Sequence, residues 1–570
     1  MANLHDKLEN FDIANNLHLS ATKLFTNKYL LNGADSLNYF DYSEYYNNLR
    51  TVNSAAEFFY NLYKKTKNFD HLDVAFVDYQ KARITSVEFE MARLSDRLNI
   101  SSNLESKKLK QFQILSDQID ELKLLELDSI ISSNIKRDEV SNIKSDIESI
   151  EIKKNDLDID GLLTANTMSF NDRIMGIDEV QKKLTDEQLL VFPAETFSDT
   201  QVTTFLISNK KVLTVRSEMS AFDLRQAGLN LRSSLQFNGT SGLNDLPEFN
   251  FQLSFQIFNE LFSSALTEFH SIKDLIVIPT WPISNLPLAV LLSDDPSKTN
   301  YGYDKQSWLG LEKNISYLPS VSDLKMLEKS NNTELFASLI GFGDPELGQK
   351  NNNLRGIKFV NIEDDELSKS YQLDLLPSLP STAEELQAIK NIFSDGKSEI
   401  YTQENATEDA IKSKDLSNYN VLLFATHGVI ADEWEFLDEA ALVMTPPKNT
   451  NTANNDGLLT TSEIRKLNLN ADLVVLSACN TASGNNQSDE GLSGLASAFI
   501  FAGAKSIMAS HWSVESNTTK QLVTTFFKNL KTSSKMTRSE AMRLSMKKLF
   551  SDHRYKHPIF WAPFILVGQS

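Results

Sequence analysis

Two nearly continuous apolar runs, Tyr419–Thr426 (YNVLLFAT) and Asp472–Ala478 (DLVVLSA), constrain the fold of this chain more than any other feature. Strands that are buried on both faces of a sheet have this composition, and they are typical of parallel sheets covered by helices. Strand-like and helix-like segments alternate around the two runs from about residue 330 to residue 570. The alternation predicts an α/β fold with a mainly parallel sheet flanked by helices.

The segments that make up this pattern can be read from hydrophobic periodicity. In the C-terminal part, the predicted strands are Leu335–Phe342, Tyr419–Thr426, Asp472–Ala478, Lys505–Ser510 and Pro563–Gly568, and the predicted helices are Thr382–Phe393, Glu490–Ala502, Ser516–Leu530 and Arg538–Phe550. The α/β region begins earlier, at about residue 185, with strand-like Gln188–Pro193, Val202–Val215 and Asp274–Pro279 and helix-like Phe251–Phe269.

The first 180 residues contain no proline and show helical spacing of their apolar residues. Ala56–Ala82 resembles one tetratricopeptide (TPR) unit, because its packing positions hold Ala56, Phe59, Leu62, Tyr63, Ala75, Tyr79 and Ala82. The apolar runs Phe112–Leu127 and Val140–Ile150 predict two long antiparallel helices, a coiled-coil hairpin. A plain amphipathic bundle arm explains these two runs as well as a binding role does.

Composition limits the partners and the compartment. A net charge of -20 argues against nucleic acid or an anionic membrane as the main partner, since both attract Lys and Arg. The single cysteine allows no internal disulfide and suits a reducing cytosol. The charged start of the chain is unlike a secretory signal, and three prolines interrupt the most apolar window, Leu275–Leu292. We therefore expect a cytoplasmic protein that neither binds nor spans a membrane.

Reactive residues follow both apolar runs. His427 and Gly428 come directly after the first run, and Cys479 comes directly after the second. The carboxyl ends of parallel strands meet at one edge of a sheet, and neighbouring strands lie about 4.8 Å apart. If these two strands are neighbours, His427 and Cys479 emerge within reach of each other.

This pairing is suited to nucleophilic catalysis by a thiol. A nearby imidazole raises the thiolate fraction of a cysteine and then serves as the acid for the leaving amine. The backbone N–H groups of Gly428 and Cys479 are the candidate oxyanion hole. Taken singly, a cysteine after a strand is usually a small core residue, and a histidine there is often a satisfied polar group. The joint pattern is more specific, and the gap of 52 residues is close to the separation of about 50 seen in caspases. The sequence lacks Cys–His clusters for zinc and lacks a phosphate loop, so we expect no metal and no cofactor.

From about residue 185 onward, a series of short motifs resembles the CHAT domain, a caspase-like module commonly fused to TPR repeats. The motifs are Leu275–Pro279, Asn285–Ala289, Tyr317–Ser320, Gly343–Pro345, Leu379–Glu385, Ala406–Thr407, Phe424–Gly428, Asp456–Thr460, Val474–Cys479, Glu490–Gly491, Ala502–Ala504, Ser510–Trp512 and His557–Trp561. The resemblance implies the caspase and separase fold group with a catalytic dyad of Cys479 and His427. Asn480, Ala482 and His511 depart from residues that are common in the family.

The helical periodicity of the first 180 residues and the resemblance together give a domain organisation. We expect a helical TPR-like region at 1–95, a long helical hairpin at 96–184, a pseudo-caspase-like half at 185–329 and a catalytic caspase-like half at 330–570. The predicted function is that of a cysteine endopeptidase acting on a specific protein substrate, regulated by its helical region and serving bacterial stress or defence signalling. Two alternatives stay open: a catalytically silent scaffold or sensor that binds partner proteins, and hydrolysis of a small-molecule amide in a closed pocket.

Proteases of this fold group hold the substrate as an extended strand against the sheet rim. Ser510–Glu515 is the predicted edge for this strand, with Ser510, His511, Trp512 and Ser513 as substrate-binding residues. Trp512 could equally be a core aromatic. Asp489 and Glu490 follow Cys479 closely and are candidates for selecting a basic P1 residue, although a solvated loop and a helix N-cap explain them too. An activating or inhibiting protein is the expected partner of the helical region.

Overall fold

The structure is a computed structural model, and it forms two compact units, Met1–Gly176 and Ile177–Ser570. It describes residues 11–26, 39–83, 86–98, 100, 102–131, 137–157, 159, 170–197, 199–236, 246–299, 301–326, 335–348, 354–355, 373, 376–393, 396–429, 437, 439–447, 455–478, 494–512 and 514–568.

The first unit is helical, as the absence of proline and the helical periodicity predict. Its helices are α2 (Phe11–Phe25), α3 (Tyr39–Thr66), α4 (Phe69–Lys81), α5 (Ser86–Leu98), α6 (Asn103–Ile131), α7 (Arg137–Asn155) and α9 (Phe170–Arg173). Helices α3 and α4 pack against each other and contain the TPR-like segment. Ala56, Phe59, Ala75 and Tyr79 are buried, and Tyr79 donates a hydrogen bond to Glu57 Oε2 at 3.0 Å.

Helices α6 and α7 also pack together, and two contacts show that they run antiparallel. The Lys154 ammonium near the end of α7 lies 4.5 Å from the ring centre of Phe112 in the first half of α6. Lys144, earlier in α7, forms a 3.4 Å ion pair with Glu126, later in α6. The predicted pair of long antiparallel helices is therefore present.

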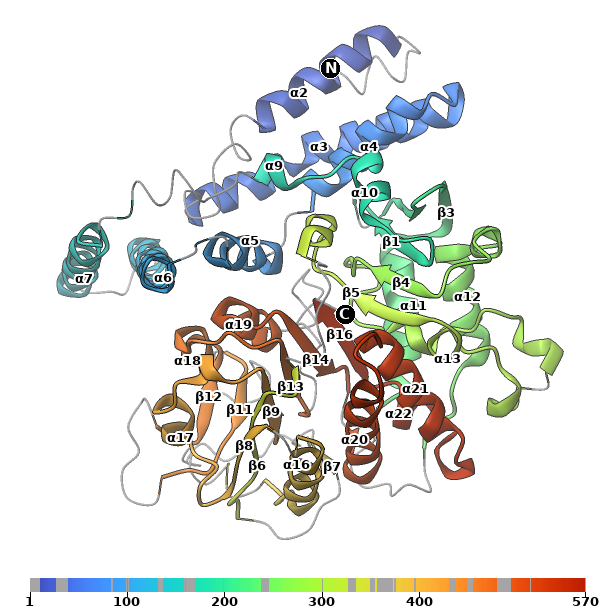
Figure 1. Cartoon of the computed structure of the whole chain (residues 1–570). Helices are drawn as coiled ribbons and strands as arrows, with labels where there is room; N and C mark the ends of the chain where they lie inside the picture. Colours follow the sequence, from blue (N-terminus) through green and yellow to red (C-terminus); the bar gives the residue numbers. More distant parts are fainter. Residues whose placement is uncertain are drawn as a thin grey trace. The chain divides into compact units, whose positions relative to one another are not determined.

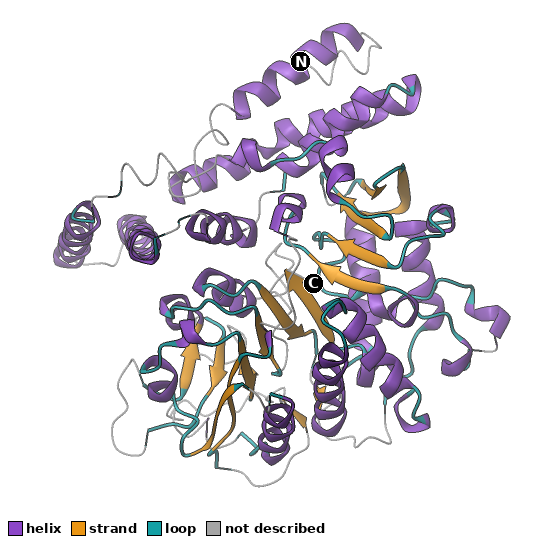
Figure 2. Cartoon of the chain, viewed as in Figure 1, coloured by secondary structure: helices purple, strands orange, loops and turns teal. Residues whose placement is uncertain are grey.

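The second unit is built on one sheet of eleven strands in the order β3-β2-β1-β4-β5-β16-β14-β13-β9-β6-β8 (Figures 1 and 2). The strands are β1 (Gln188–Ala194), β2 (Gln201–Ser208), β3 (Val212–Ser220), β4 (Asp274–Val277), β5 (Asn314–Tyr317), β6 (Ser338–Pro345), β8 (Lys397–Gln403), β9 (Val421–Ala425), β13 (Leu473–Leu476), β14 (Ser506–Ser510) and β16 (Phe564–Gly568). Pairing is parallel except for β1–β2, β2–β3 and β14–β16. The predicted α/β class with a mainly parallel sheet is confirmed.

The C-terminal strand β16 joins the two predicted α/β halves into this one sheet. It pairs in parallel with β5, which belongs to the first half, and antiparallel with β14, which belongs to the second half. The sheet therefore continues without a break across the expected boundary between residues 329 and 330.

Two segments differ from the prediction in their detail. The alternating run Val202–Val215 is not one strand but parts of β2 and β3, an antiparallel hairpin with its turn at residues 209–211. The helix predicted over Phe251–Phe269 ends at Phe262, because the next residue, Ser263, adopts a φ of 45° and stops the helix. A 3-10 turn, Ala265–Glu268, follows.

Helices cover the sheet, and their bounds are α10 (Ile177–Lys183), α11 (Ala221–Ser233), α12 (Phe251–Phe262), α13 (Leu309–Glu312), α16 (Pro380–Ile392), α17 (Glu408–Lys412), α18 (Thr461–Lys466), α19 (Gly494–Ala502), α20 (Ser516–Thr532), α21 (Arg538–Phe550) and α22 (Pro558–Trp561). Helices α16, α20 and α21 form a packed row, while α18 and α19 pack together elsewhere on the sheet. Two small sheets complete the unit, one of β10 (Gly428–Val429), β11 (Ala441–Val443) and β12 (Leu458–Thr460), and one of β7 (Leu354–Arg355) and β15 (Val514–Glu515).

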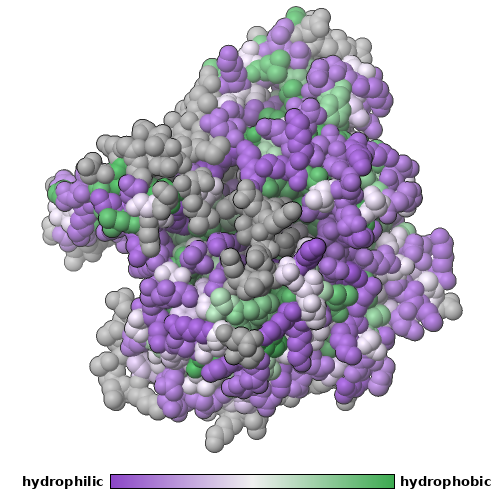
Figure 3. Space-filling view, in the orientation of Figure 1, coloured by the Kyte–Doolittle hydropathy of each residue, from purple (hydrophilic) through white to green (hydrophobic). Residues whose placement is uncertain are grey.

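The core lies where the apolar runs predict it. Every residue of β9 and of β13 is buried. On the face of the molecule shown in Figure 3, hydrophilic residues predominate and apolar residues lie among them. Among the helices that the structure describes, none combines the length and the apolar character that a membrane crossing requires.

Candidate functional site

The two strands that lead to the reactive residues are direct neighbours. β9 and β13 pair in parallel from Val421 with Leu473 to Phe424 with Leu476, so paired residues are always 52 positions apart. The ladder continues beyond the strands, since the Ser477 N–H donates to the Phe424 carbonyl at 2.8 Å. This neighbour relation is the condition under which the sequence predicts a pairing at the sheet edge.

His427 is held firmly at the carboxyl end of β9. Its side chain is only 1% exposed, and Nε2 lies 2.8 Å from the backbone carbonyl oxygen of Pro377. Because a carbonyl oxygen can only accept, Nε2 is the protonated nitrogen in this contact. In the neutral ring Nδ1 is then the acceptor nitrogen, so the contact selects the tautomer as well as the ring orientation.

Pro377 belongs to a segment that packs beside the small sheet β10-β11-β12. Two apolar residues just before it, Leu373 and Leu376, share one buried cluster with Leu437 and with four residues of that sheet: Val429, Ala441, Val443 and Leu458. Burial of these apolar side chains keeps the Pro377 carbonyl near His427. A backbone carbonyl carries no sequence signature, so sequence reasoning missed this partner.

Gly428 begins β10, and backbone bonds tie this strand to β11. The Val443 N–H donates to the His427 carbonyl at 2.9 Å, and the Thr426 hydroxyl donates to the Val443 carbonyl at 2.5 Å. These bonds fix the backbone on both sides of His427. Gly428 thereby has a defined position at the sheet edge next to the imidazole.

Glu408 binds the backbone just before β12 and so stabilises the same small sheet. It is fully buried, and its Oε1 accepts hydrogen bonds from the Asp456 and Gly457 N–H groups at 2.8 and 2.7 Å. Gly457 has a φ of 92°, a left-handed conformation that favours glycine. Burial raises the pKa of Glu408, while the Lys412 ammonium at 2.6 Å opposes this shift.

Ser510 ends β14 and holds the chain just before the predicted nucleophile. Its buried hydroxyl donates to the carbonyl of Ala478 at 2.5 Å. Sequence reasoning assigned Ser510 to substrate binding, whereas the observed contact anchors the residue that precedes Cys479.

His511 and Trp512 are buried in the same region. The Trp512 side chain has no exposed surface, and its Nε1–H donates to the Ile559 carbonyl at 3.0 Å. Burial and, secondarily, the nearby Arg232 guanidinium lower the pKa of His511 well below its usual value, so this imidazole is neutral at physiological pH. These environments are those of core residues, and a substrate-binding role for either residue stays a prediction.

Both ends of Ser510–Glu515, the predicted edge for a substrate strand, pair with other strands, and its use as a substrate edge stays a prediction. β14 lies between β13 and β16, and β15 pairs antiparallel with β7 through Val514 with Arg355 and Glu515 with Leu354. The other predicted site residues, Cys479, Asp489, Glu490 and Ser513, lie outside the described residues.

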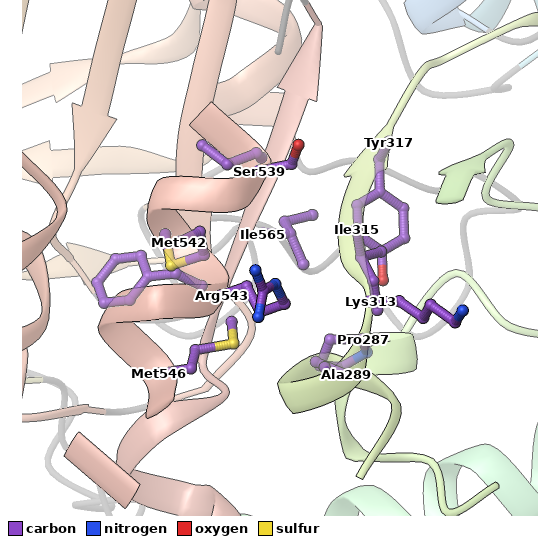
Figure 4. A pocket seen from close by; sticks show the side chains of 13 residues that line it. Pro287, Ala289, Lys313, Ile315, Tyr317, Ser539, Met542, Arg543, Met546 and Ile565 are labelled. Carbon is purple, nitrogen blue, oxygen red and sulfur yellow. The ribbon is translucent and has the colours of Figure 1, made fainter. Parts of the chain in front are cut away.

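A separate pocket lies between α21 and β5. Figure 4 shows Met542, Arg543 and Met546 of α21 facing Ile315 and Tyr317 of β5. The residues that line it include neither His427 nor Trp512. In the part of the chain that the structure describes, no group of three or more His, Cys, Asp or Glu side chains is arranged to hold a metal ion.

Curated relatives match a limited stretch. Tetratricopeptide repeat protein 28 of Mus musculus is 35% identical over 113 residues, and that of Homo sapiens is 32% identical over 113 residues. Each match covers 20% of this chain and only 4% of the relative. The chain therefore spans a small part of the length of these relatives.

Solved structures show distant similarity. The Saccharomyces cerevisiae separase–securin complex gives a TM-score of 0.41 at 10% identity, covering 100% of this chain and 40% of that chain. The complex of the pro- and mature domains of Porphyromonas gingivalis RgpB gives a TM-score of 0.32 at 10% identity, covering 62% and 77%.

The family model described as the CHAT domain matches residues 252–569. This range includes β9, β13, His427 and most of the eleven-stranded sheet. The match confirms the resemblance that the short motifs indicate. Because the matched residues are more than half of the 570 in the sequence, the chain belongs to the CHAT domain family.

Proposed function

We propose that this chain is a cysteine endopeptidase that cleaves a specific protein substrate with Cys479 as nucleophile and His427 as its acid–base partner. The observation that carries the proposal is the register of β9 and β13, whose paired residues are 52 positions apart. Cys479 also follows His427 by 52 positions. A register that continued to the strand ends would bring the two residues level, on adjacent parallel strands about 4.8 Å apart.

In this proposal the Pro377 carbonyl determines which ring nitrogen does the chemistry. Nε2 keeps its proton in the 2.8 Å contact, so Nδ1 takes the proton from the Cys479 thiol, and the thiolate so formed attacks the scissile carbonyl. His427 then returns that proton to the leaving amine, and a water hydrolyses the thioester. The N–H groups of Gly428 and Cys479 would stabilise the oxyanion of each tetrahedral intermediate.

The test is a comparison of newly formed protein termini in cells that contain the wild-type chain or Cys479→Ala. The proposal predicts one or a few cleaved substrates that appear only with the wild-type chain, and the sites reveal the P1 preference. The same substrates, cleaved at the same rate by Cys479→Ala, would exclude this residue as the nucleophile. A basic P1 residue would support selection by Asp489 and Glu490.

A second candidate is a catalytically silent scaffold or sensor that binds partner proteins. It is favoured by the 1% exposure of His427, since a working acid–base group has to meet its substrate. The two candidate functions predict different cellular phenotypes for Cys479→Ala. A cellular phenotype that survives Cys479→Ala supports the scaffold, and a phenotype that is lost supports the protease.

We further propose that the helical unit regulates the protease, in a bacterial stress or defence response and through a protein partner. The packed pair α3–α4 and the antiparallel pair α6–α7 offer extended surfaces of the kind that bind partner segments. Deletion of residues 1–176, at the boundary between the two compact units, should abolish the partner's effect on substrate cleavage. Full, partner-dependent activation of the truncated enzyme would contradict regulation by the helical unit.

A further inference from the structure

Two sequence motifs with no assigned role, Gly343–Pro345 and Leu379–Glu385, meet at the carboxyl end of β6. The Asp344 N–H donates to the Thr382 hydroxyl at 2.7 Å, and the Thr382 hydroxyl donates to the Leu379 carbonyl at 2.8 Å. Thr382 is fully buried and Asp344 is 3% exposed. A single hydroxyl therefore bridges the end of β6 to the segment that precedes α16.

The backbone at Asp344 is bent to make this bridge. The register between β6 and β8 shifts between Gly343 and Pro345, and Asp344 adopts a φ of 46° in the left-handed region. Aspartate adopts this conformation more readily than most non-glycine residues, and such bulges commonly re-aim a side chain near a functional site. Gly343 allows the close approach to β9, because a Cβ there would lie 2.7 Å from the Ala425 carbonyl oxygen.

The Asp344 side chain makes a second link to the same segment. Its Oδ2 accepts a hydrogen bond from Gln403 Nε2, and the Leu379 backbone lies near enough to stabilise its negative charge. Burial raises the pKa of Asp344, while Gln403 and the Leu379 backbone oppose that rise by stabilising the carboxylate. Leu379 is thus held through its carbonyl by the Thr382 hydroxyl, and its backbone interacts electrostatically with the Asp344 carboxylate.

Leu379 lies two residues after Pro377, whose carbonyl contacts His427 Nε2. Packing of Leu373 and Leu376 holds the segment on the other side of Pro377. The Pro377 carbonyl therefore lies between two fixed segments, one held by apolar packing and the other by hydrogen bonds. Only the second depends on the polar side chains Asp344 and Thr382.

We infer that Asp344 and Thr382 are positioning residues that hold the Pro377 carbonyl against His427 and so select the tautomer with Nδ1 as acceptor. The inference rests on the proposed function, since it concerns how His427 acts on Cys479. Neither residue touches the reacting atoms. If Asp344 and Thr382 only stabilised the start of α16, their substitution would lower the stability of the fold without changing the reactivity of the Cys479 thiol. The test measures this difference.

The test uses the reactivity of the thiol, because the full-length chain contains only one cysteine and any alkylation of the folded chain reports on Cys479. The rate of reaction with iodoacetamide is measured against pH for wild type, Thr382→Val, Thr382→Ser and Asp344→Asn. Valine matches threonine in shape but lacks the hydroxyl, whereas serine keeps the hydroxyl. His427→Ala, measured in parallel, tests the dyad itself.

A matched control comes from the other end of the same strand. Ser338 is a buried hydroxyl of β6 that donates to Asn420 Oδ1 at 2.7 Å, at the end of the strand opposite Asp344. Ser338→Ala also removes a buried hydrogen bond, so the stability of this variant should fall about as much as that of Thr382→Val. Its alkylation profile should stay that of wild type.

We expect the pH midpoint of alkylation, which reports the pKa of the Cys479 thiol, to lie in wild type below the pKa of about 8.5 for a free thiol. Thr382→Val should raise the midpoint by about one pH unit, which slows alkylation about tenfold at pH values below both midpoints. Asp344→Asn should raise it less, and Thr382→Ser should restore the wild-type profile.

Suppose that His427→Ala raises the midpoint, while Thr382→Val and Asp344→Asn both keep the wild-type midpoint. This result overturns the inference and supports the dyad. A midpoint that His427→Ala does not move instead refutes the dyad and the inference with it. If Thr382→Val does not fold, Asp344→Asn decides alone.

Discussion

His427→Gln is expected to slow cleavage of the substrate by about 10²- to 10⁴-fold, the usual contribution of general acid–base catalysis. Glutamine keeps an N–H that can donate to the Pro377 carbonyl, so the 2.8 Å contact can be retained in the variant. It cannot take up and return a proton near neutral pH. The loss should therefore appear in kcat, with a small change in KM, and it is measured with the substrate identified from the cleaved termini.

The chain offers a closely matched control for this variant. His557 is also a buried histidine, with Nε2 lying 3.0 Å from the carbonyl oxygen of another proline, Pro247. Burial lowers the pKa of His557 to about 4, so the ring is neutral under assay conditions. His557→Gln should alter stability but leave kcat close to wild type. Equal losses of kcat in the two variants would show that the effect of His427→Gln comes from packing, and the proposed role of His427 would fail.

Trp512→Ala is expected to lower the free energy of unfolding by about 3–5 kcal/mol, because the substitution leaves a large cavity in the core. Trp512 has no exposed surface, and its Nε1–H is satisfied by the Ile559 carbonyl. Chemical denaturation of the full chain measures the change. Trp512→Phe should lose less, since it keeps an aromatic ring and gives up mainly the 3.0 Å hydrogen bond.

This experiment distinguishes the two interpretations of Trp512 that the sequence leaves open, a core aromatic residue and a wall of the substrate pocket. A wall of the substrate pocket would raise KM on truncation and cost little stability. Trp281, which is partly exposed and lies under the Arg225 guanidinium at 5.0 Å, is a suitable comparison for a less buried tryptophan. If Trp512→Ala costs no more than Trp281→Ala and raises KM, Trp512 lines the substrate site.

The strands that carry the candidate dyad could be predicted because they are buried on both faces. Tyr419–Thr426 and Asp472–Ala478 contain the observed β9 and β13 with one or two extra residues at each end. Helix α21 coincides with the predicted Arg538–Phe550. In each case a long apolar or periodic pattern outweighs local alternatives.

Other strands escaped prediction for a physical reason. β8 (KSEIYTQ) is an edge strand whose residues are all exposed or partly exposed, so it lacks the apolar run of a central strand. β10, β11 and β12 contain two or three residues each, too few for a period to be recognised. Their positions follow from packing against Leu373 and Leu376.

The sequence by itself determined which family the chain belongs to, which strands form the centre of its sheet and which histidine follows one of them, since all three depend on local patterns of residues. Only the tertiary structure decided that β9 and β13 are neighbours, that β16 joins two halves into one sheet, and that the Pro377 carbonyl meets His427. These relations join residues about 50 or more positions apart through backbone groups that every residue possesses. Because such groups carry no residue identity, their partners are set by how the whole chain packs.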